Sequence, residues 1–273
     1  MGTVGIVTGA GRGMGKACAL ALAEAVDTLI LVDLDAGAAD ATAKEIAGPA
    51  AAEAFAGDVS SADDMKRLAA QAAEAGTLRA VAHAAGISPT MAPWDKVLTV
   101  DLHGTALLTE SLRPQVGTGT AFVCFASMAS LLRSFEGFPE ADAALDEPLD
   151  PEMPSKVRAA LGESVEDTGT AYSWAKRGVQ RFVAREAAWF GARGARICSV
   201  SPGIIDTPQG RQEAKAHASM AQLVQMTPLA REGAAAEVAA VVAFLLSEAA
   251  SFVTGIDVPV DGGVVSALKT MPR

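Results

Sequence analysis

The sequence has few of the residues that build disulfide-rich, metal-bound or membrane-embedded proteins. Only three of its 273 residues are cysteines, and their wide separation predicts neither a disulfide framework nor a cysteine-based metal site. Cys18, Cys124 and Cys198 each lie in an apolar stretch, which is typical of small core residues in a reducing compartment. No apolar run reaches about 18 residues without a charge or a turn former, so we expect no membrane-spanning helix.

Basic residues are in deficit as well. Lysine and arginine total 22 against 32 aspartate and glutamate residues, which gives a formal net charge of -10. Nucleic acid and anionic membranes bind basic surfaces, so we expect neither as a partner. The first residues run directly into an apolar segment and lack the basic and apolar regions of a secretory signal. These features together favour a cytoplasmic protein.

Hydrophobic residues are abundant, at 50% of the chain, and their spacing alternates between two periods. Segments with helical patterns separate short runs of apolar and β-branched residues. Such alternation is typical of βαβ units, which form a parallel sheet with helices on both faces. We predict one doubly wound α/β domain over residues 1–273, with a seven-stranded parallel sheet whose strands lie at 3–8, 28–32, 52–56, 78–84, 120–126, 195–200 and 256–260.

Two segments interrupt the alternation. Residues 131–169 are polar and contain several prolines, and we expect a short helix near 155–161 within this insertion. Residues 204–233 contain apolar side chains at roughly helical spacing. This second segment is either a substrate lid or a helix that packs onto the domain, and the spacing alone favours neither.

A glycine-rich turn follows the first predicted strand and opens a predicted helix. The amino end of a helix presents unpaired N–H groups and a positive dipole, which suit a pyrophosphate. Glycine lets the backbone turn sharply and approach the phosphates closely. The turn therefore predicts a dinucleotide site formed by Gly9, Gly11, Arg12, Gly13, Met14 and Gly15.

Acidic residues follow the second and third predicted strands. Asp33, next to Leu34, is placed to accept the hydroxyls of an adenosine ribose, and its charge would repel a 2′-phosphate. Asp33 thus favours NAD over NADP, whereas Arg12 in the glycine-rich turn favours the 2′-phosphate. We give Asp33 more weight because it would face the ribose directly. Asp58 and Val59 follow the third strand, where they would flank the adenine.

Tyr172 is the single tyrosine of the chain, and Lys176 lies one helical turn after it in a predicted helix. Residues at this spacing share one helix face. Taken alone, the pair is more typical of a packed tyrosine beside an extended lysine stem. Together with a dinucleotide site, it indicates proton transfer at a substrate oxygen, with Lys176 favouring the ionised tyrosine.

These ordered motifs resemble the classical short-chain dehydrogenases/reductases, and the resemblance covers nearly the whole chain. The glycine-rich turn matches the family pattern Thr-Gly-x-x-x-Gly-x-Gly, and Tyr172 and Lys176 match Tyr-x-x-x-Lys. The resemblance implies a Rossmann fold, a nicotinamide dinucleotide and a catalytic set of Ser127, Tyr172 and Lys176. It also implies that the last two bind the cofactor, together with Ala84, Ala85, Gly86, Pro202, Gly203, Ile205 and Thr207.

The chain departs from the family pattern at three places. Asp101 stands where the family has an asparagine that supports a proton relay, and His83 and Ala84 replace two further asparagines. We include Asp101 in the catalytic set, and its effect depends on whether the main-chain carbonyl or the side chain does the work. The long segment between Ser127 and Tyr172 is similar to that of 3α-hydroxysteroid dehydrogenase/carbonyl reductase-like members. In such members it can lie where the usual tetramer interface would form, which argues against the familiar tetramer. We expect a homo-oligomer, either dimer or tetramer.

The resemblance and Asp33 together predict an NAD(H)-dependent oxidoreductase. Its substrate would be a small hydrophobic secondary alcohol or ketone, with a hydroxysteroid as one candidate. Apolar side chains such as Ile87, Met91 and Trp94 either line the substrate pocket or belong to the core. Two alternatives are an NADPH-dependent 3-oxoacyl-thioester reductase and a dinucleotide-binding sensor or scaffold with little catalysis. No residue spacing indicates a metal site.

Overall fold

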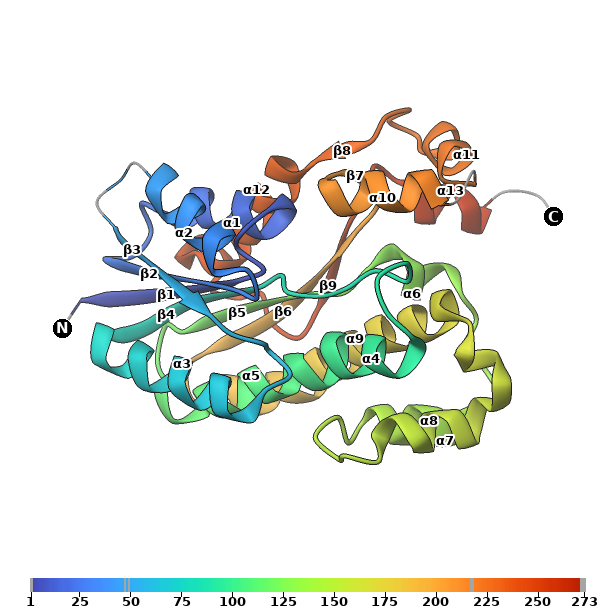
Figure 1. The fold of residues 1–273 in the computed structure, drawn as a ribbon, viewed down its shortest axis with the longest axis horizontal. Helices are drawn as coiled ribbons and strands as arrows, with labels where there is room; N and C mark the ends of the chain where they lie inside the picture. Colours follow the sequence, from blue (N-terminus) through green and yellow to red (C-terminus); the bar gives the residue numbers. More distant parts are fainter. Residues whose placement is uncertain (1, 47, 49, 217–218, 271–273) are drawn as a thin grey trace.

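The computed structural model describes residues 2–46, 48, 50–216 and 219–270 of the chain. At its centre is a seven-stranded sheet in which each pair of neighbouring strands is parallel, so the predicted α/β fold is confirmed (Figure 1). The order across the sheet is β3-β2-β1-β4-β5-β6-β9. These strands are β1 (Thr3–Thr8), β2 (Thr28–Asp33), β3 (Ala51–Ala56), β4 (Thr77–His83), β5 (Ala121–Phe125), β6 (Arg196–Pro202) and β9 (Asp257–Val260).

Successive strand residues point into two separate cores. Ile6 and Phe122 belong to one hydrophobic cluster, whereas their neighbours Val7 and Val123 belong to the other. Every residue of β5 is buried. Strands covered on both faces are apolar throughout, because neither face meets water. The polar side chains expected to act on a ligand therefore lie at the ends of these strands.

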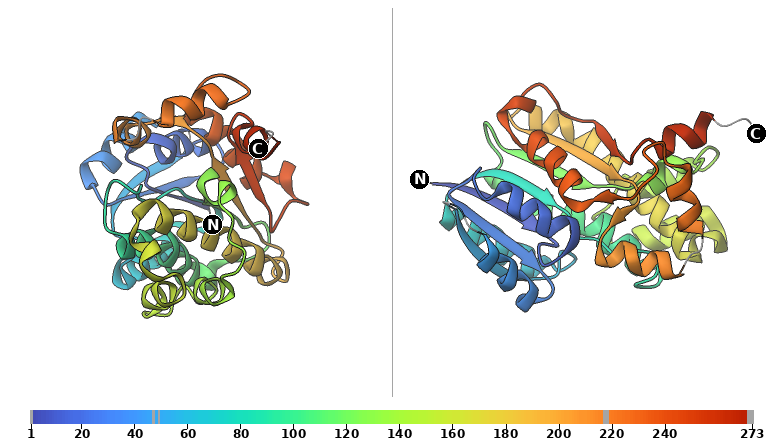
Figure 2. Two further views of the ribbon diagram at one scale, coloured as in Figure 1. Left: turned by 90° about the vertical axis from the view of Figure 1, so that its right-hand side faces the viewer. Right: turned by 90° about the horizontal axis from the view of Figure 1, so that it is seen from above.

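Helices cover both faces of the sheet, as Figures 1 and 2 show. Side chains such as Leu22 and Leu245 fill one core, and Met65, Leu108 and Phe182 fill the other. One face carries α1 (Gly13–Leu22), α2 (Ala36–Glu45) and α12 (Ala235–Leu246), and the other carries α3 (Ala62–Ala75), α5 (Gly104–Leu112) and α9 (Thr168–Gly191).

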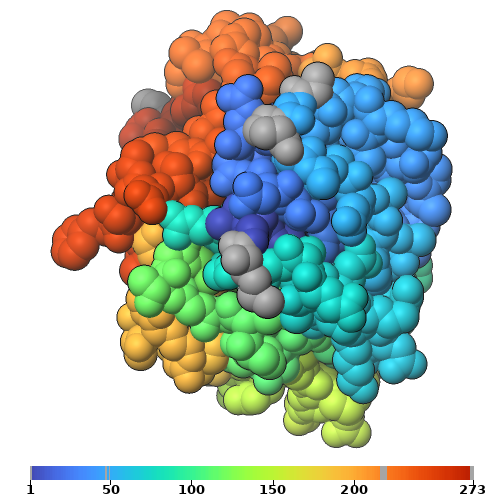
Figure 3. All heavy atoms as spheres, turned by 90° about the vertical axis from the view of Figure 1, so that its left-hand side faces the viewer, coloured from blue at the N-terminus to red at the C-terminus, as the bar shows by residue number. Residues whose placement is uncertain are grey.

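The winding direction reverses between β1 and β4. The chain passes outward from β1 to β3 and then returns to the other side of β1 to build β4, β5, β6 and β9. Helices leave in opposite directions at such a point, which opens a crevice at the carboxyl ends of the strands. Figure 3 shows the opposite end of the molecule, where the strands begin and where amino-terminal and carboxyl-terminal segments lie against one another.

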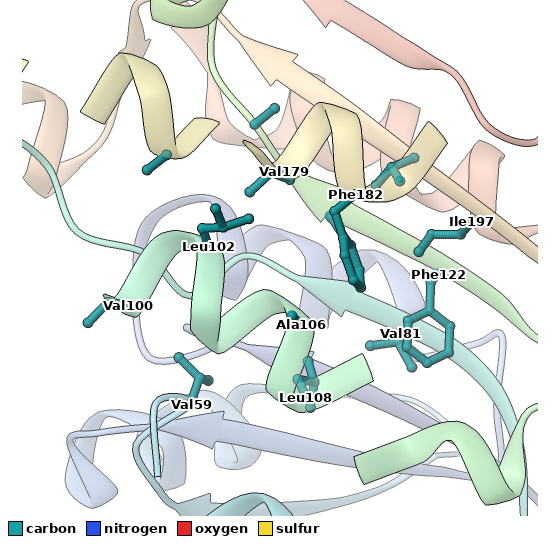
Figure 4. Packing of buried hydrophobic residues seen from close by; sticks show 14 of the residues in the cluster. Val59, Val81, Val100, Leu102, Ala106, Leu108, Phe122, Val179, Phe182 and Ile197 are labelled. Carbon is teal, nitrogen blue, oxygen red and sulfur yellow. The ribbon is translucent and has the colours of Figure 1, made fainter. Parts of the chain in front are cut away.

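The helical segment from Trp94 to Leu112 contains a widened turn. It comprises α4 (Trp94–Leu98), a π-helical turn η1 (Thr99–His103) and then α5. The Gly104 N–H donates to the Thr99 carbonyl, and the Thr105 hydroxyl donates to the Asp101 carbonyl at 2.7 Å. Such turns are frequent at functional sites. The turn brings Leu102 against α9 near Val179, and Gly178 permits this approach because a Cβ there would lie 2.5 Å from Leu102 Cδ2 (Figure 4).

The segment 131–169 folds into a helical hairpin. The expected helix is present as α8 (Met153–Leu161), but a second helix, α7 (Pro139–Leu145), was not predicted from the sequence. The two helices pack on each other beside α9 (Figure 1). The rest of the segment contains α6 (Met128–Leu132) and η3 (Gly162–Glu166).

Arginines on α9 hold this hairpin in place. Arg177 Nε and Arg181 Nη2 each lie 2.7 Å from a carboxylate oxygen, of Asp142 and Asp146 respectively. Acidic residues of this segment are thus partners of a helix that begins more than 20 residues later in the chain. Local sequence patterns do not reveal such pairing, which explains why α7 was missed.

Residues 204–233 form two helices and one short pair of strands. The helices are α10 (Pro208–Ala216) and α11 (Ser219–Met226), and the strands are β7 (Ile205–Asp206) and β8 (Gly233–Ala234). Met220, Leu223 and Val224 pack against a small hydrophobic cluster that is separate from the two main cores. The buried members of that cluster are Met128, Ile204, Val264 and Val265, the last two from α13 (Val264–Thr270).

Candidate active site

A cavity of about 350 Å³ opens at the carboxyl ends of β1 and β4. It lies at the reversal of the sheet, where the topology places a ligand crevice. Most of the residues expected to bind the dinucleotide line it, namely Gly9, Arg12, Gly13, Met14, Gly15, Asp33, Leu34, Asp58, Val59, Ala84, Ala85, Gly86 and Thr207.

The glycine-rich turn has a shape that side chains would prevent. Gly9 and Gly13 adopt φ angles of 65° and 57°, and a Cβ on Gly15 would lie 2.1 Å from the Gly9 carbonyl oxygen. Helix α1 begins at Gly13, so its unpaired N–H groups face the cavity. The turn is therefore suited to hold an anionic group such as a pyrophosphate.

Asp33 is held rigidly at the end of β2. Its Oδ2 accepts the Gly11 N–H at 2.8 Å, and its Oδ1 accepts the Asp35 N–H at 3.0 Å. Each oxygen keeps a second lone pair for a ligand hydroxyl. Gly11 itself does not line the cavity, but a Cβ there would lie 2.9 Å from Asp33 Oδ2. Arg12 is exposed at the same cavity.

Ser127, Tyr172 and Lys176 come together beside this cavity. Ser127 follows β5 and caps α6, and its side chain hydrogen-bonds Tyr172 on α9. Lys176 Nζ donates to the Phe125 carbonyl at 2.9 Å and lies 5.5 Å from the Tyr172 ring centroid. A Cβ on Gly86 would lie 3.2 Å from Lys176 Nζ, so this glycine brings the ammonium to the cavity wall.

The protein's own groups favour the protonated form of Tyr172. Burial raises the pKa of Tyr172, the Asp101 carboxylate raises it further, and the hydrogen bond with Ser127 acts in the opposite direction. A buried hydroxyl that keeps its proton is a hydrogen-bond donor to a ligand oxygen. Removal of that proton requires added positive charge nearby.

Asp101 is fully enclosed behind Gly86. Its Oδ1 accepts the Ile87 N–H at 2.8 Å, and its Oδ2 lies 3.4 Å from Lys176 Nζ. Its main-chain carbonyl accepts the Thr105 hydroxyl. The side chain of Asp101, rather than its carbonyl, is therefore the part that faces Lys176.

His83 rebuilds the polar contacts at a position where the family has asparagine. Thr105 donates to the Asp101 carbonyl, so its oxygen accepts from His83 Nε2 at 3.0 Å. His83 Nδ1 then accepts the Thr8 hydroxyl at 2.8 Å, and Thr8 in turn accepts the Ala85 N–H. Burial, aided by the Lys176 charge, lowers the pKa of His83 to about 3. The imidazole is neutral and fixes the turn after β4.

Six expected cofactor residues lie outside the lining of the cavity: Gly11, Tyr172 and Lys176, described above, and Pro202, Gly203 and Ile205. Pro202 ends β6, Gly203 follows it, and Ile205 begins the short β7 pair. The Gly203 N–H bonds the Val260 carbonyl at 3.0 Å, which joins this segment to the end of β9. Lining residues that the sequence did not point to are Gly57, Ala92, Lys96, Val100, Pro208 and Gln209.

A parallel sheet with a glycine-lined crevice defines a nucleotide-binding α/β protein, and comparisons with known proteins narrow the class. A family model described as short chain dehydrogenase matches residues 3–139, and one described as Enoyl-(Acyl carrier protein) reductase matches residues 157–265. The chain belongs to the short-chain dehydrogenase family. The sequence-based recognition is thereby confirmed.

Individual relatives agree with this assignment. A D-threitol dehydrogenase from Mycolicibacterium smegmatis is 31% identical over 96% of this chain and 92% of its own. A 3-alpha-hydroxysteroid dehydrogenase/carbonyl reductase from Comamonas testosteroni is 31% identical over 68% of this chain and 72% of its own. The crystal structure of levodione reductase matches with a TM-score of 0.78 and 28% identity, over 97% of this chain and 98% of that one.

The family membership carries a general activity. The chain is an oxidoreductase of alcohols and ketones that uses a nicotinamide dinucleotide and acts on a small molecule. Among the described residues, no helix is long and apolar enough to cross a membrane. In the same part of the chain, no group of three or more histidine, cysteine or acidic side chains is arranged to hold a metal ion.

Proposed function

We propose that the protein is an NAD(H)-dependent oxidoreductase that interconverts a hydrophobic secondary alcohol and the corresponding ketone. The observation that carries the proposal is the convergence of Ser127, Tyr172 and Lys176 beside the glycine-lined cavity. A nicotinamide dinucleotide bound in that cavity would accept or deliver the hydride. The side chains of the protein would bind the substrate oxygen and move its proton.

Each of the three side chains has one main task in this proposal. Ser127 hydrogen-bonds the substrate oxygen, and Tyr172 takes the hydroxyl proton in oxidation and returns it in reduction. Lys176 binds the nicotinamide ribose hydroxyls and adds positive charge near Tyr172. Because burial raises the pKa of Tyr172, proton removal would rely on that charge and on the positive nicotinamide of the oxidised cofactor.

The preference for NAD rests on Asp33. Two backbone N–H groups fix its carboxylate at the cavity wall, where an adenosine ribose would place its hydroxyls. A 2′-phosphate at that place would lie beside the negative charge of Asp33, whose side chain is held by these bonds and cannot rotate away. The remaining cofactor contacts would come from the lining residues given above, with Gly11, Pro202, Gly203 and Ile205 around them.

The hydrophobic substrate is proposed from the surroundings of residues 204–233. The side chains of Met220 and Leu223 pack against the hydrophobic cluster that contains Ile204 and Met128, the residue that directly follows Ser127. We therefore propose that this segment of a single domain closes over an apolar substrate as a lid, and that residues 131–169 are an insertion. A cytoplasmic homo-oligomer is part of the same proposal.

An oxidation assay tests cofactor and substrate together. The purified protein is incubated with NAD+ or NADP+ and, separately, with a 3α-hydroxysteroid, a small apolar secondary alcohol and D-threitol, and reduced nicotinamide is followed by its absorbance. We expect a higher kcat/KM with NAD+ and with the apolar alcohols. Preference for D-threitol would overturn the substrate proposal.

Arg12 gives one observation in favour of NADPH, because it lines the same cavity. The competing function is an NADPH-dependent 3-oxoacyl-thioester reductase. Tighter binding of NADPH than of NADH, together with reduction of a 3-oxoacyl thioester, would establish that alternative. Dinucleotide binding without turnover of any of these substrates would instead indicate a sensor or scaffold.

A further inference from the structure

A buried carboxylate faces Lys176, and a gain in folding stability does not explain its presence there. Asp101 Oδ2 lies 3.4 Å from Lys176 Nζ, and no hydrogen-bond partner of Oδ2 is found among the described residues. A buried ion pair costs desolvation energy that only good geometry and further hydrogen bonds offset. An asparagine would keep the bond from the Ile87 N–H through its own carbonyl oxygen, without the charge.

Few other titratable groups surround Asp101, Lys176 and Tyr172. Burial raises the pKa of Asp101 itself, and Lys176 and the Ile87 N–H act in the opposite direction. Burial raises the pKa of the Cys124 thiol to about 12, and His83 is neutral because burial lowers its pKa to about 3. Glu213 on α10 acts on Tyr172 more weakly than Asp101 does. Within the described part of the chain, the titratable groups that face the Asp101–Lys176 pair or Tyr172 are thus His83 from β4, Cys124 from β5 and Glu213 from α10.

We propose that Asp101 is a positioning residue whose carboxylate offsets the charge of Lys176 and so sets the pH at which Tyr172 exchanges its proton. The proposal deepens the oxidoreductase function proposed above and rests on it. Lysine alone stabilises a neighbouring tyrosinate, and a carboxylate 3.4 Å from the ammonium acts against that effect. The π-helical turn is what delivers the carboxylate to this place.

The offset favours the acid form of Tyr172 at neutral pH. Ketone reduction needs that form, because Tyr172 then gives its proton to the substrate oxygen. Alcohol oxidation needs the base form and gains from higher pH. The substitution Asp101→Asn keeps size and shape, removes one negative charge and so lowers the pH at which the base form appears.

The chain offers a direct spectroscopic test, because Tyr172 is its single tyrosine. The ultraviolet absorbance of tyrosinate is titrated against pH in the native protein, with and without NAD+, for the natural sequence and for Asp101→Asn. We expect the midpoint of the variant to lie lower by at least about one pH unit, a tenfold change in proton affinity. The pH profile of kcat/KM for alcohol oxidation should move in the same direction.

Two further variants control the result. Glu213→Gln removes the other carboxylate that acts on Tyr172 and should shift the midpoint less than Asp101→Asn. If Asp101→Asn does not fold, Asp101→Ser supplies a smaller neutral side chain for the same titration. Equal midpoints in the natural protein and the neutral variant would overturn the proposal, since Asp101 would then already be protonated. Loss of the proposed function has a different signature: no turnover at any pH, whatever the tyrosinate titration shows.

Discussion

At the scale of single residues, the proposed function depends on the hydroxyl of Tyr172. Ser127 hydrogen-bonds it from the end of β5, and Lys176 lies one turn further along α9. Tyr172→Phe removes the hydroxyl and leaves the ring packing in place. We expect kcat for alcohol oxidation to fall by roughly 100- to 10,000-fold, the usual contribution of a positioned acid–base group.

Dinucleotide binding separates this effect from a general loss of structure. The Tyr172→Phe variant should bind NADH with an affinity close to that of the natural protein, measured by fluorescence titration. Turnover at the natural rate would contradict the role of Tyr172. Loss of both binding and turnover would point to misfolding instead.

His83 makes a prediction about pH and stability. An unfolded histidine has a pKa near 6.5, whereas burial lowers the pKa of His83 to about 3 in the folded protein. Between these values the unfolded chain binds the extra proton, so the free energy of unfolding falls as the pH is lowered through this window. The contribution of His83 should reach about 1.4 kcal/mol per pH unit.

Denaturant unfolding at a series of pH values measures this slope. His83→Gln supplies an amide that donates and accepts but does not titrate, so the variant should lose this part of the pH dependence. Equal slopes for both proteins would show that His83 is not held neutral. Other acidic groups contribute to both proteins alike and cancel in the comparison.

At the scale of elements, the sequence predicted regular strands well and local departures poorly. Apolar runs such as 28–32 predicted strands, because a strand that is buried on both faces contains few polar residues. The π-helical turn could not be predicted in this way. It depends on His83 from β4, which bonds Thr105, and on close packing of Leu102 against Gly178, both of which are tertiary contacts.

The candidate site shows the same division. Sequence motifs predicted the positions of Ser127, Tyr172 and Lys176. The order of strand, turn and helix predicted that the glycine-rich turn binds a dinucleotide. The pairing of Asp101 with Lys176 did not. The sequence predicted only that either the side chain or the carbonyl of Asp101 would act. Which of the two is available depends on the hydrogen bond from Thr105, which uses the carbonyl.

The hairpin of α7 and α8 gives the prediction that belongs to this scale. Asp142 accepts from Arg177 and Arg181. Asp142→Asn keeps the shape of the side chain and weakens these bonds. We expect the free energy of unfolding to fall by about 1 kcal/mol, and amide hydrogen exchange to accelerate in α7 and α8 more than in the sheet.

A surface pair in the same hairpin provides the control. Lys156 pairs with Asp150, and Lys156 is exposed. Lys156→Met should change neither the stability nor the exchange pattern measurably, since exposed ion pairs contribute little. Uniform acceleration across the whole protein in Asp142→Asn would show that the hairpin does not open on its own.

At the scale of the whole molecule, a ligand that binds in the cavity should raise the free energy of unfolding. A ligand that binds only the folded state stabilises it by mass action. NAD+ at about 100 times its dissociation constant should raise the free energy of unfolding by about 2.7 kcal/mol, seen as a higher melting temperature. Gly15→Ala should abolish most of that rise, because its Cβ would lie 2.1 Å from the Gly9 carbonyl oxygen.

Gly37→Ala is the matched control for this measurement. The nearest atom to a Cβ on Gly37 is Asp35 Oδ1 at 3.4 Å, an ordinary contact. This variant should keep the stabilisation by NAD+. If Gly15→Ala retained the full rise in melting temperature, the glycine-rich turn would not be the binding site.

The arginines that hold the hairpin lie on the same helix as Tyr172 and Lys176. Arg177 and Arg181 anchor α9 to α7 through bonds made within one chain. The helix that contains Tyr172 is thus braced on the side of α7 by bonds within its own chain. Each chain should therefore keep its specific activity on dilution, even at concentrations where an assembly of subunits has come apart.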